Sequence, residues 1–404
     1  MHMRWTALAV TVVAAGPARG DETRPITFAE ARAAAERLAP DVLQAERREG
    51  VAEADVRVAG TWPNPTLTVE SATITAHLIT AVSVPLPIFG QVSTQEDASR
   101  AALRVARLDT AASRNDARWA ATVAWIDLRE AGERARVLAD AAADAARTAE
   151  VAGRRFDAGS APRIDVVRAA ADRARARSEA DSADAAVRAA AARLAAFLGE
   201  PAGTALRGAG APDYPRDLPA RPALAAGVDE HPAIRRDRAA VDAAEARVRA
   251  ERRQRIPVVA AQVSVSAFDP TQPGTDVVFG VSLEVPLFNF RGGAVARARA
   301  DEALARTTVD AERRRLASQL DDAIERAGGA AARMRALAEE VVPGMTEARR
   351  MTEDAYRDGR VDLTRLLEAQ RALNDARAAL VEAEAVWARA VADVERAAGG
   401  RYAR

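Results

Sequence analysis

Apolar residues recur every three or four positions over most of this chain, which predicts long amphipathic helices. From about Gln91 to Val151 nothing breaks the pattern, and a second run extends from about Gly293 to Val342, where Pro343 and Gly344 interrupt it. The last helix repeats a large apolar residue every seven positions, with alanine three positions after each. The two sets are Leu366, Leu373, Leu380, Trp387 and Val394, and Ala369, Ala376, Ala383, Ala390 and Ala397. This seam predicts coiled-coil packing.

Four short segments between the helices alternate apolar and polar residues, which predicts β-strands. The first pair covers residues 66–70 and 78–84, and the second pair covers 262–267 and 279–285. In the second pair the apolar positions share one predicted face: Val263, Val265, Val281, Leu283 and Val285. The opposite face carries Ser264, Ser266, Ser282 and Glu284. The pattern is typical of a half-buried soluble sheet and also of a barrel strand with lipid on one side.

The chain contains two related halves. Pro40 and Pro232 lie 192 residues apart, as do Pro65 and Pro257. Farther along, the segment 155–159 (RFDAG) matches 355–359 (AYRDG) at an offset of 200 residues. Each half reads as a helix, two strands, a very long helix, a glycine turn and another long helix. We therefore predict an internal duplication, with the first repeat over residues 21–210 and the second over residues 211–404.

The N-terminus has the features of a secretory signal peptide. Arg4 supplies a positive charge, an apolar run follows from Trp5 to Ala15, and Ala18 to Gly20 form a small-residue cleavage site. We predict that residues 1–20 are the signal peptide and that the mature chain begins almost directly with a helix, because Thr27 and Glu30 have the spacing of a capping box. No later stretch approaches the roughly 20 apolar residues of a transmembrane helix, so any membrane span must consist of strands.

Composition excludes several classes of function. The chain has 58 basic and 58 acidic residues, and every basic one is arginine, so no net charge favours a nucleic-acid partner. The lack of cysteine excludes disulfides, thiolate metal sites and a lipidated N-terminal cysteine. His2, His77 and His231 have no ligand partners at metal spacing, and no phosphate-binding loop follows a strand. We expect no catalytic residue, no metal and no cofactor.

Four strands cannot close a barrel, and an open strand edge cannot lie in lipid. Three copies would supply twelve strands and set their long helices around one axis. The expected fold class is mostly α with a small β part: an α-barrel of long coiled-coil helices, and four strands per protomer in a trimeric 12-stranded transmembrane β-barrel. The alternative is a secreted soluble coiled-coil scaffold whose strand pairs form a small sheet.

The two glycine turns resemble the helix-hairpin tips of the TolC family of trimeric outer-membrane factors. The segments that carry this resemblance are 156–166 (FDAGSAPRIDV) and 356–368 (YRDGRVDLTRLLE). The resemblance covers about residues 27–400. In its modest length and in the absence of an N-terminal cysteine, the chain resembles the CzcC-like, cation-efflux branch of the family. In this family the tips close the tunnel and dock an adaptor protein. The resemblance therefore implies adaptor docking at Gly159, Ser160, Gly359 and Val361.

The same resemblance implies a gate at these tips. Asp165 matches a family aspartate that helps to hold the closed state, and Tyr356 matches its tyrosine partner. The family's linking arginine falls on Val361, with Arg360 beside it as a candidate substitute. At the inner constriction Glu368 matches one acidic position, whereas Arg365 occupies the other, which weakens the expectation of a cation-selective ring. An ordinary solvated helix surface is the alternative for each of these residues.

The function implied by the resemblance is a passive exit duct in the outer membrane and periplasm of a Gram-negative bacterium. It implies a homotrimer that contacts outer-membrane lipid and a periplasmic adaptor protein. An inner-membrane transporter, of the RND type or the ABC type, would supply metal cations or drugs. A type I secretion duct is the alternative within the same family.

Overall fold

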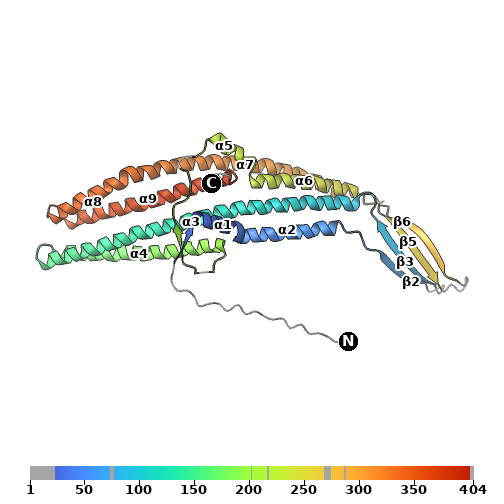
Figure 1. Ribbon diagram of the computed structural model, residues 1–404, viewed down its shortest axis with the longest axis horizontal. Coiled ribbons are helices and arrows are strands. Elements are labelled where there is room, and N and C mark those ends of the chain that lie inside the picture. Colours follow the sequence, from blue (N-terminus) through green and yellow to red (C-terminus); the bar gives the residue numbers. More distant parts are fainter. Residues whose placement is uncertain are drawn as a thin grey trace, which may run out of the picture.

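The computed structural model describes residues 23–72, 77–201, 203–215, 218–267, 274–285 and 288–400. These residues form an elongated bundle of long helices with a sheet at one end and two helix-hairpin turns at the other (Figure 1). The predicted signal peptide lies outside the described residues.

The first half of the chain contains two sheet-end strands and a long helical hairpin. Its elements are β1 Arg24–Thr27, α1 Phe28–Leu38, α2 Pro40–Ala59, β2 Thr66–Ala72, β3 His77–Leu86, α3 Gln91–Asp157, α4 Arg163–Leu198 and β4 Leu206–Ala209. The predicted capping box is confirmed, because the Thr27 side chain accepts from the Glu30 N–H and the Glu30 carboxylate accepts from the Thr27 N–H. The predicted long helix is also confirmed: α3 has 67 residues, and at 1.5 Å per residue it is roughly 100 Å long.

The second half repeats this plan. Its elements are α5 Arg221–Val228, α6 Pro232–Arg253, β5 Val259–Ala267, β6 Asp276–Leu283, α7 Gly292–Ala336, η1 Leu337–Val341, α8 Val342–Arg357 and α9 Leu363–Ala397. The predicted interruption at Pro343 is confirmed, and it takes the form of a π-helical turn, η1, in which the Val342 N–H bonds to the Leu337 carbonyl. A proline ring clashes with the carbonyl four residues before it, and the wider π turn relieves that clash.

Three short elements differ from the sequence prediction. The strand β1 precedes α1 and pairs in parallel with β4, Arg24 opposite Leu206 and Thr27 opposite Ala209, and neither strand was predicted. The short helix α5 was not predicted either. Four-residue strands carry too few alternating positions to show a period, and only the tertiary fold brings this pair together.

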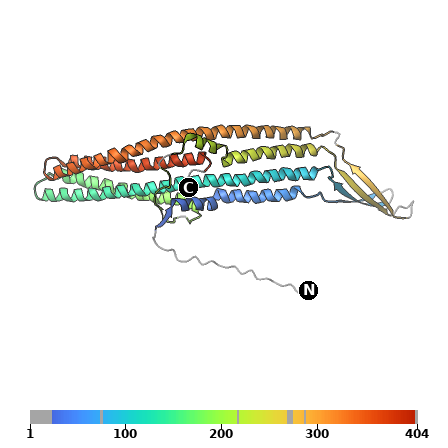
Figure 2. The same cartoon turned by 45° about the horizontal axis from the view of Figure 1, so that its top comes forward.

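The long helices form one layer in which α3 is an inner helix along its whole length (Figure 2). Toward the sheet α3 packs against α2 and α6, and toward the hairpin turns it packs against α4 and α9. α7 packs against α6 and α9, and α8 packs against α9. The layer therefore has two edges, one formed by α2 and α4 and the other by α7 and α8.

The main core lies at the middle of the bundle, where β1 and α1 cover α3. Trp125 is fully buried there, and its indole N–H donates to the Ile26 carbonyl at 2.8 Å. Phe28 packs edge-on against Trp125 and Tyr214, with ring centroids 5.3 and 5.2 Å apart. Alanine is the commonest residue in the rest of this core, which lets the helices approach closely. The predicted α9 seam is mostly buried, including Leu366, Leu373 and Val394.

The four strands at the end of the bundle form one antiparallel sheet in the order β2-β3-β5-β6. Val263 lies opposite Val82 on one side and Phe279 on the other, and directly opposite residues point to the same face. One face of the sheet is therefore largely apolar, and it includes Leu67, Val69, Leu78, Val82, Val84, Val259, Val263, Val265, Val277, Phe279, Val281 and Leu283. The other face carries mostly small and polar residues such as Thr68, Ser83, Ser264 and Ser282.

The predicted bounds of the last strand, residues 279–285, are wrong at both ends. β6 runs from Asp276 to Leu283, so Val285 lies beyond the strand. In the observed register position 285 would face Pro257, which has no N–H to donate to a ladder. Within the part of the chain that the structure describes, no helix combines the length and apolar character that crossing a bilayer requires.

Candidate functional site

Both hairpin turns have the same backbone geometry. Gly159 and Gly359 adopt left-handed φ values of 71° and 73°. The following residue closes each turn, because the Ser160 N–H donates to the Arg155 carbonyl at 2.8 Å and the Arg360 N–H donates to the Ala355 carbonyl at 2.8 Å. This six-residue pattern ends a helix on glycine because glycine has no Cβ to clash in the left-handed region. The two turns thus place four adaptor-docking candidates, Gly159, Ser160, Gly359 and Val361, at one end of the bundle (Figure 1).

The structure does not join Asp165 to Tyr356. Tyr356 is buried in a cluster with Ala152, Ala169, Leu363, Leu366 and Leu367. The Arg155 guanidinium lies 4.7 Å from the centre of the Tyr356 ring, and Arg155 also donates to the Tyr356 carbonyl at 3.3 Å. Asp165 lies half-buried in the first turn of α4, and within the described chain its carboxylate makes no hydrogen bond or ion pair. Tyr356 therefore ties the second hairpin to Arg155 of the first hairpin.

The three charged candidates of the second hairpin pair locally. Arg360 forms an ion pair at 2.6 Å with Asp358, two residues before it in the same turn. Arg365 and Glu368 form an ion pair at 3.4 Å on the surface of α9. Within one protomer Arg360 does not link the two hairpins. Arg365 and Glu368 lie side by side, so they present a mixed pair of charges.

Polar contacts that the sequence prediction missed join the hairpins a short distance from the turns. Arg371 of α9 forms an ion pair at 2.5 Å with Asp172 of α4, whose side chain is buried. Arg168 donates to the Thr364 hydroxyl at 2.9 Å, and Gln370 donates to the Thr148 hydroxyl at 3.2 Å. Asp172 lies seven residues after Asp165, and this heptad spacing is the one feature of the sequence that could have marked it as a candidate. Its partner could not be identified, because nothing in the pattern sets the register between α4 and α9.

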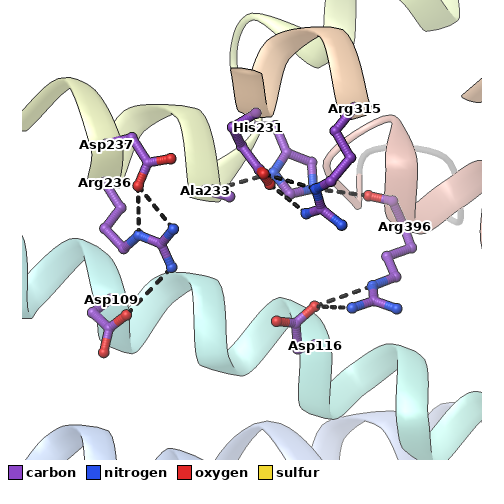
Figure 3. A network of polar contacts seen from close by, with 9 residues as sticks. Asp109, Asp116, His231, Ala233, Arg236, Asp237, Arg315 and Arg396 are labelled. Carbon is purple, nitrogen blue, oxygen red and sulfur yellow. Dashed lines mark hydrogen bonds and ion pairs between the residues drawn. The ribbon is translucent and has the colours of Figure 1, made fainter. Parts of the chain in front are cut away.

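A second polar site lies at the middle of the bundle, where the end of α9 meets the start of α6 (Figure 3). His231 caps α6, because its Nδ1 accepts from the Ala233 N–H at 3.1 Å. Its Nε2 lies 3.1 Å from the Arg396 carbonyl. Since Nδ1 is the acceptor, Nε2 carries the proton and donates to α9. The neutral imidazole therefore joins the two helices end to end.

Ion pairs surround this histidine and line a cavity of about 360 Å³. Arg396 of α9 pairs with Asp116 of α3 at 2.9 Å, and Arg236 of α6 lies 3.6 Å from Asp109 of α3. Burial lowers the pKa of His231, outweighing the opposite effects of its bond to the Arg396 carbonyl and of the carboxylates. Within the described residues no group of three or more histidine or acidic side chains is placed to hold a metal ion.

Comparisons with known proteins agree on one family. A family model described as outer membrane efflux protein matches residues 32–200 and residues 228–400. The cobalt-zinc-cadmium resistance protein CzcC of Cupriavidus metallidurans is 26% identical over 332 residues, covering 80% of this chain and 78% of CzcC. The crystal structure of CusC aligns with a TM-score of 0.77 at 15% identity over 92% of each chain. The outer membrane protein VceC of Vibrio cholerae aligns with a TM-score of 0.74 at 17% identity over 93% of this chain and 96% of VceC.

Proposed function

Because this chain belongs to the outer membrane efflux protein family, we propose that three copies assemble into a passive exit duct. The protein is an outer-membrane efflux channel of the CzcC type, and it extends into the periplasm. In the proposed system an inner-membrane transporter, of the RND or the ABC type, delivers the cargo through a periplasmic adaptor. The duct itself carries out no chemical reaction.

The four-stranded sheet is the observation that carries this proposal. One face is apolar and suits lipid, and the opposite face is polar or small and suits a water-filled lumen. The edge strands β2 and β6 each have one side without a ladder partner in the described chain. Each unpaired backbone group costs several kcal/mol in hydrocarbon, about as much as a lost hydrogen bond without compensation. Pairing of β6 with β2 of the next copy satisfies both edges, and three copies close a twelve-stranded ring.

The helical layer supports the same assembly. Its two edges leave large apolar side chains exposed, such as Leu304 of α7 and Met351 of α8. Packing the α7 and α8 edge against the α2 and α4 edge of a neighbour covers these side chains. The same rotation that closes the sheet then extends the layer into an α-barrel.

The hairpin turns form the periplasmic end of the proposed duct. Asp165, Tyr356, Arg360, Arg365 and Glu368 are proposed to line or hold its constriction, and the inter-hairpin pair of Asp172 and Arg371 joins them. The exposed pairs of Arg360 with Asp358 and of Arg365 with Glu368 contribute only about 0–1 kcal/mol each, so contact with an adaptor can break them. The adaptor is proposed to bind at Gly159, Ser160, Gly359 and Val361.

The relative that is matched over most of its length supports a proposal for the cargo. CzcC is a cobalt-zinc-cadmium resistance protein, so metal cations are the first class of cargo that we propose, and drugs are the second. A ring of Arg365 and Glu368 pairs carries charges of both signs and selects little between them. Selection of cargo is therefore assigned to the transporter.

Substituting arginine on either face of the sheet tests the duct. Val263→Arg places a charge on the proposed lipid face of the central strand β5, at a cost of about 2–4 kcal/mol at mid-bilayer. Ser264→Arg is the matched control, because its side chain points to the other face. We expect detergent-stable trimers in outer-membrane fractions for the unchanged protein and Ser264→Arg, and their loss for Val263→Arg. Equal assembly of both variants, or a wild-type protein that remains a soluble monomer, would contradict the proposal.

A further inference from the structure

The helix ends beside the sheet carry different charges in the two halves. Residues 53–65, which lead from α2 into β2, contain one arginine and two acidic residues, whereas the corresponding residues 245–257, which lead from α6 into β5, contain five arginines and two acidic residues. The first nine residues of α3 contain two acidic residues and no arginine, and the first nine of α7 contain two arginines and no acidic residue. The second half therefore places an excess of positive charge at the base of the sheet (Figure 1).

The two halves also differ in how these charges are paired. In the first half Glu96 pairs with Arg100 at 2.6 Å, and Glu53 pairs with Arg107 at 3.1 Å. Four exposed arginines of the second half form no ion pair and no side-chain hydrogen bond within the described chain: Arg249, Arg252, Arg253 and Arg299. We call these four residues the arginine patch.

The arginine patch lies on one side of the helical layer. At 100° per residue its three α6 members fall within about 100° of one another. Its α7 member, Arg299, precedes Arg306 by two turns, and Arg306 pairs at 2.9 Å with Glu245, one turn before Arg249. Arg306 also pairs with Glu302 at 2.6 Å, so neither carboxylate neutralises the patch.

This side of the layer continues into the apolar face of the sheet. Gln254 lies about 140° around α6 from Arg249, and it lines a groove with Ile256, Val258 and Pro87. Val258 precedes β5 by one residue and Pro87 follows β3 by one, so strand alternation places both on the polar side of the sheet. The groove therefore lies on the polar side, and the arginine patch lies on the apolar side.

The link between β6 and α7 marks the height of the membrane boundary. Phe288 and Phe290 in this link are 98% and 64% exposed. Exposed aromatic rings at the rim of a membrane-spanning sheet are typical of the boundary between hydrocarbon and headgroups. Arg253 reaches the corresponding link of the first half, because its Nε is 3.7 Å from the position that a Cβ on Gly90 would take. The arginine patch therefore begins at this boundary.

We propose that the arginine patch binds the phosphate groups of anionic phospholipids in the periplasmic leaflet of the outer membrane. The inference rests on the proposed duct, in which the apolar face of the sheet contacts lipid and the helices extend into the periplasm. A guanidinium group presents planar N–H donors that bind phosphate oxygens in pairs. Since the four arginines have no acidic partner in the described chain, no internal ion pair has to break before the lipid binds.

Helix stability alone does not explain the arginine patch. The dipole of α6 favours cations in its last turn, which accounts for Arg252 and Arg253. Arg299 lies near the start of α7, the end at which a helix dipole favours anions instead. The acidic residues at the corresponding helix ends of the first half repel anionic lipid, so each protomer has one such site, in its second half.

Native mass spectrometry of the purified protein in detergent tests the arginine patch. Dioleoyl phosphatidylglycerol is the probe, and dioleoyl phosphatidylethanolamine is the zwitterionic comparison. Each basic residue close to an anionic lipid surface contributes about fivefold to binding. We therefore expect replacement of all four patch arginines by glutamine to weaken phosphatidylglycerol binding by at least about tenfold. Replacement of the same four by lysine keeps the charge and should retain most of the binding.

Four arginines of α4 provide the matched control, because they are also exposed and form no ion pair within the described chain: Arg173, Arg177, Arg188 and Arg193. Their replacement by glutamine removes the same charge at a distance from the sheet (Figure 1) and should leave phosphatidylglycerol binding unchanged. If the fourfold patch variant does not fold, Arg253→Gln and Arg299→Gln are measured one at a time, and each should weaken binding by about fivefold.

The outcomes separate this inference from the proposed function. A trimer that binds the two lipids equally, or that loses binding equally in the patch and α4 variants, overturns the inference and leaves the duct in place. Displacement of phosphatidylglycerol by millimolar inorganic phosphate would show a site for free phosphate, which also overturns the inference. A wild-type protein that sediments as a monomer overturns the duct, whether or not the lipid binds.

Discussion

The two halves of this chain share a backbone plan, but different side chains secure it. In the first half α3 runs without interruption, and Ala39 begins α2 without a side-chain cap. In the second half the corresponding helix contains the π turn η1, and His231, 192 residues after Ala39, caps α6 and bonds to α9. Both halves place their helices in the same arrangement. The side chains at the helix starts differ between the halves, and so does their contribution to stability.

The two halves therefore differ in where their helices are least stable and where they are joined most strongly. A continuous long helix can open only by losing consecutive hydrogen bonds, whereas a π turn is already one bond out of register. The second half therefore contains the weaker point along its long helix and the stronger polar junction at its middle. Four predictions test this contrast, from the largest expected effect to the smallest.

Replacing Pro343 tests the origin of the π turn. Pro343→Ala restores the missing N–H and removes the ring, so we expect α7 and α8 to fuse into one regular helix like α3. Because proline costs up to about 3 kcal/mol in a helix interior, the amides of residues 337–342 should exchange with solvent up to about 100-fold more slowly by mass spectrometry. Gly344→Ala is the control, with open space for its methyl group and about 1 kcal/mol of expected gain. If these amides exchange at an unchanged rate in Pro343→Ala, the proline is not the cause of the π turn.

The pair of Asp172 and Arg371 tests how firmly the hairpins are tied within a chain. A double-mutant cycle with Asp172→Ala and Arg371→Ala should give a coupling free energy of about 1–2 kcal/mol, toward the low end for hydrogen bonds between charged groups, because Arg371 is partly exposed. The measurement is thermal unfolding in detergent at low and high salt. Arg173→Ala, which removes a nearby exposed arginine, should change stability by less than about 0.5 kcal/mol. Additive effects of the two substitutions would show that the ion pair contributes nothing.

The two helix starts at the middle of the bundle provide a matched pair of substitutions. His231→Ala should cost about 1 kcal/mol, because the first turn of α6 loses its acceptor. Ala39→Ser adds a hydroxyl acceptor at the corresponding start of α2 and should stabilise by up to about 1 kcal/mol. Chemical unfolding of both variants measures these changes. If the two changes in unfolding free energy are equal and opposite, the helix cap accounts for most of the difference between the halves at this point. If His231→Ala leaves the unfolding free energy unchanged, His231 does not stabilise the second half.

The smallest expected effect is a pH dependence of the second half. Burial keeps the pKa of His231 below its ordinary value of 6.5, so the folded state binds fewer protons than the unfolded state as pH falls through that value. Its contribution is therefore complete above about pH 6.5 and is lost at lower pH, by up to about 0.7 kcal/mol between pH 7 and pH 6. The groups that face it are Asp116, Glu312, Arg315 and Arg396. His231→Asn keeps a capping acceptor but does not titrate, and His77 is present in both proteins, so their difference isolates His231. Parallel pH profiles would contradict this prediction.

The sequence by itself determined the repeating plan of this protein. Proline and glycine positions marked the ends of its helices, the heptad seam of α9 marked its buried side, and alternation marked the strands. These features depend on residues that are near one another in the chain, where helical and strand periods act directly. Of the candidate site, the sequence predicted the two glycine turns. Their left-handed backbone conformation suits glycine because glycine has no Cβ.

Only the tertiary structure decided which distant residues meet. The pairing of β1 with β4, the stacking of Arg155 on Tyr356 and the ion pair of Asp172 with Arg371 each join segments more than 170 residues apart. Asp165 is the opposite case: its sequence context matches a gate residue of the family, but among the described residues its carboxylate has no partner. Long charged side chains can reach several neighbours with similar energy. Their partners are therefore set by the register and rotation of packed helices, which the pattern along one chain does not encode.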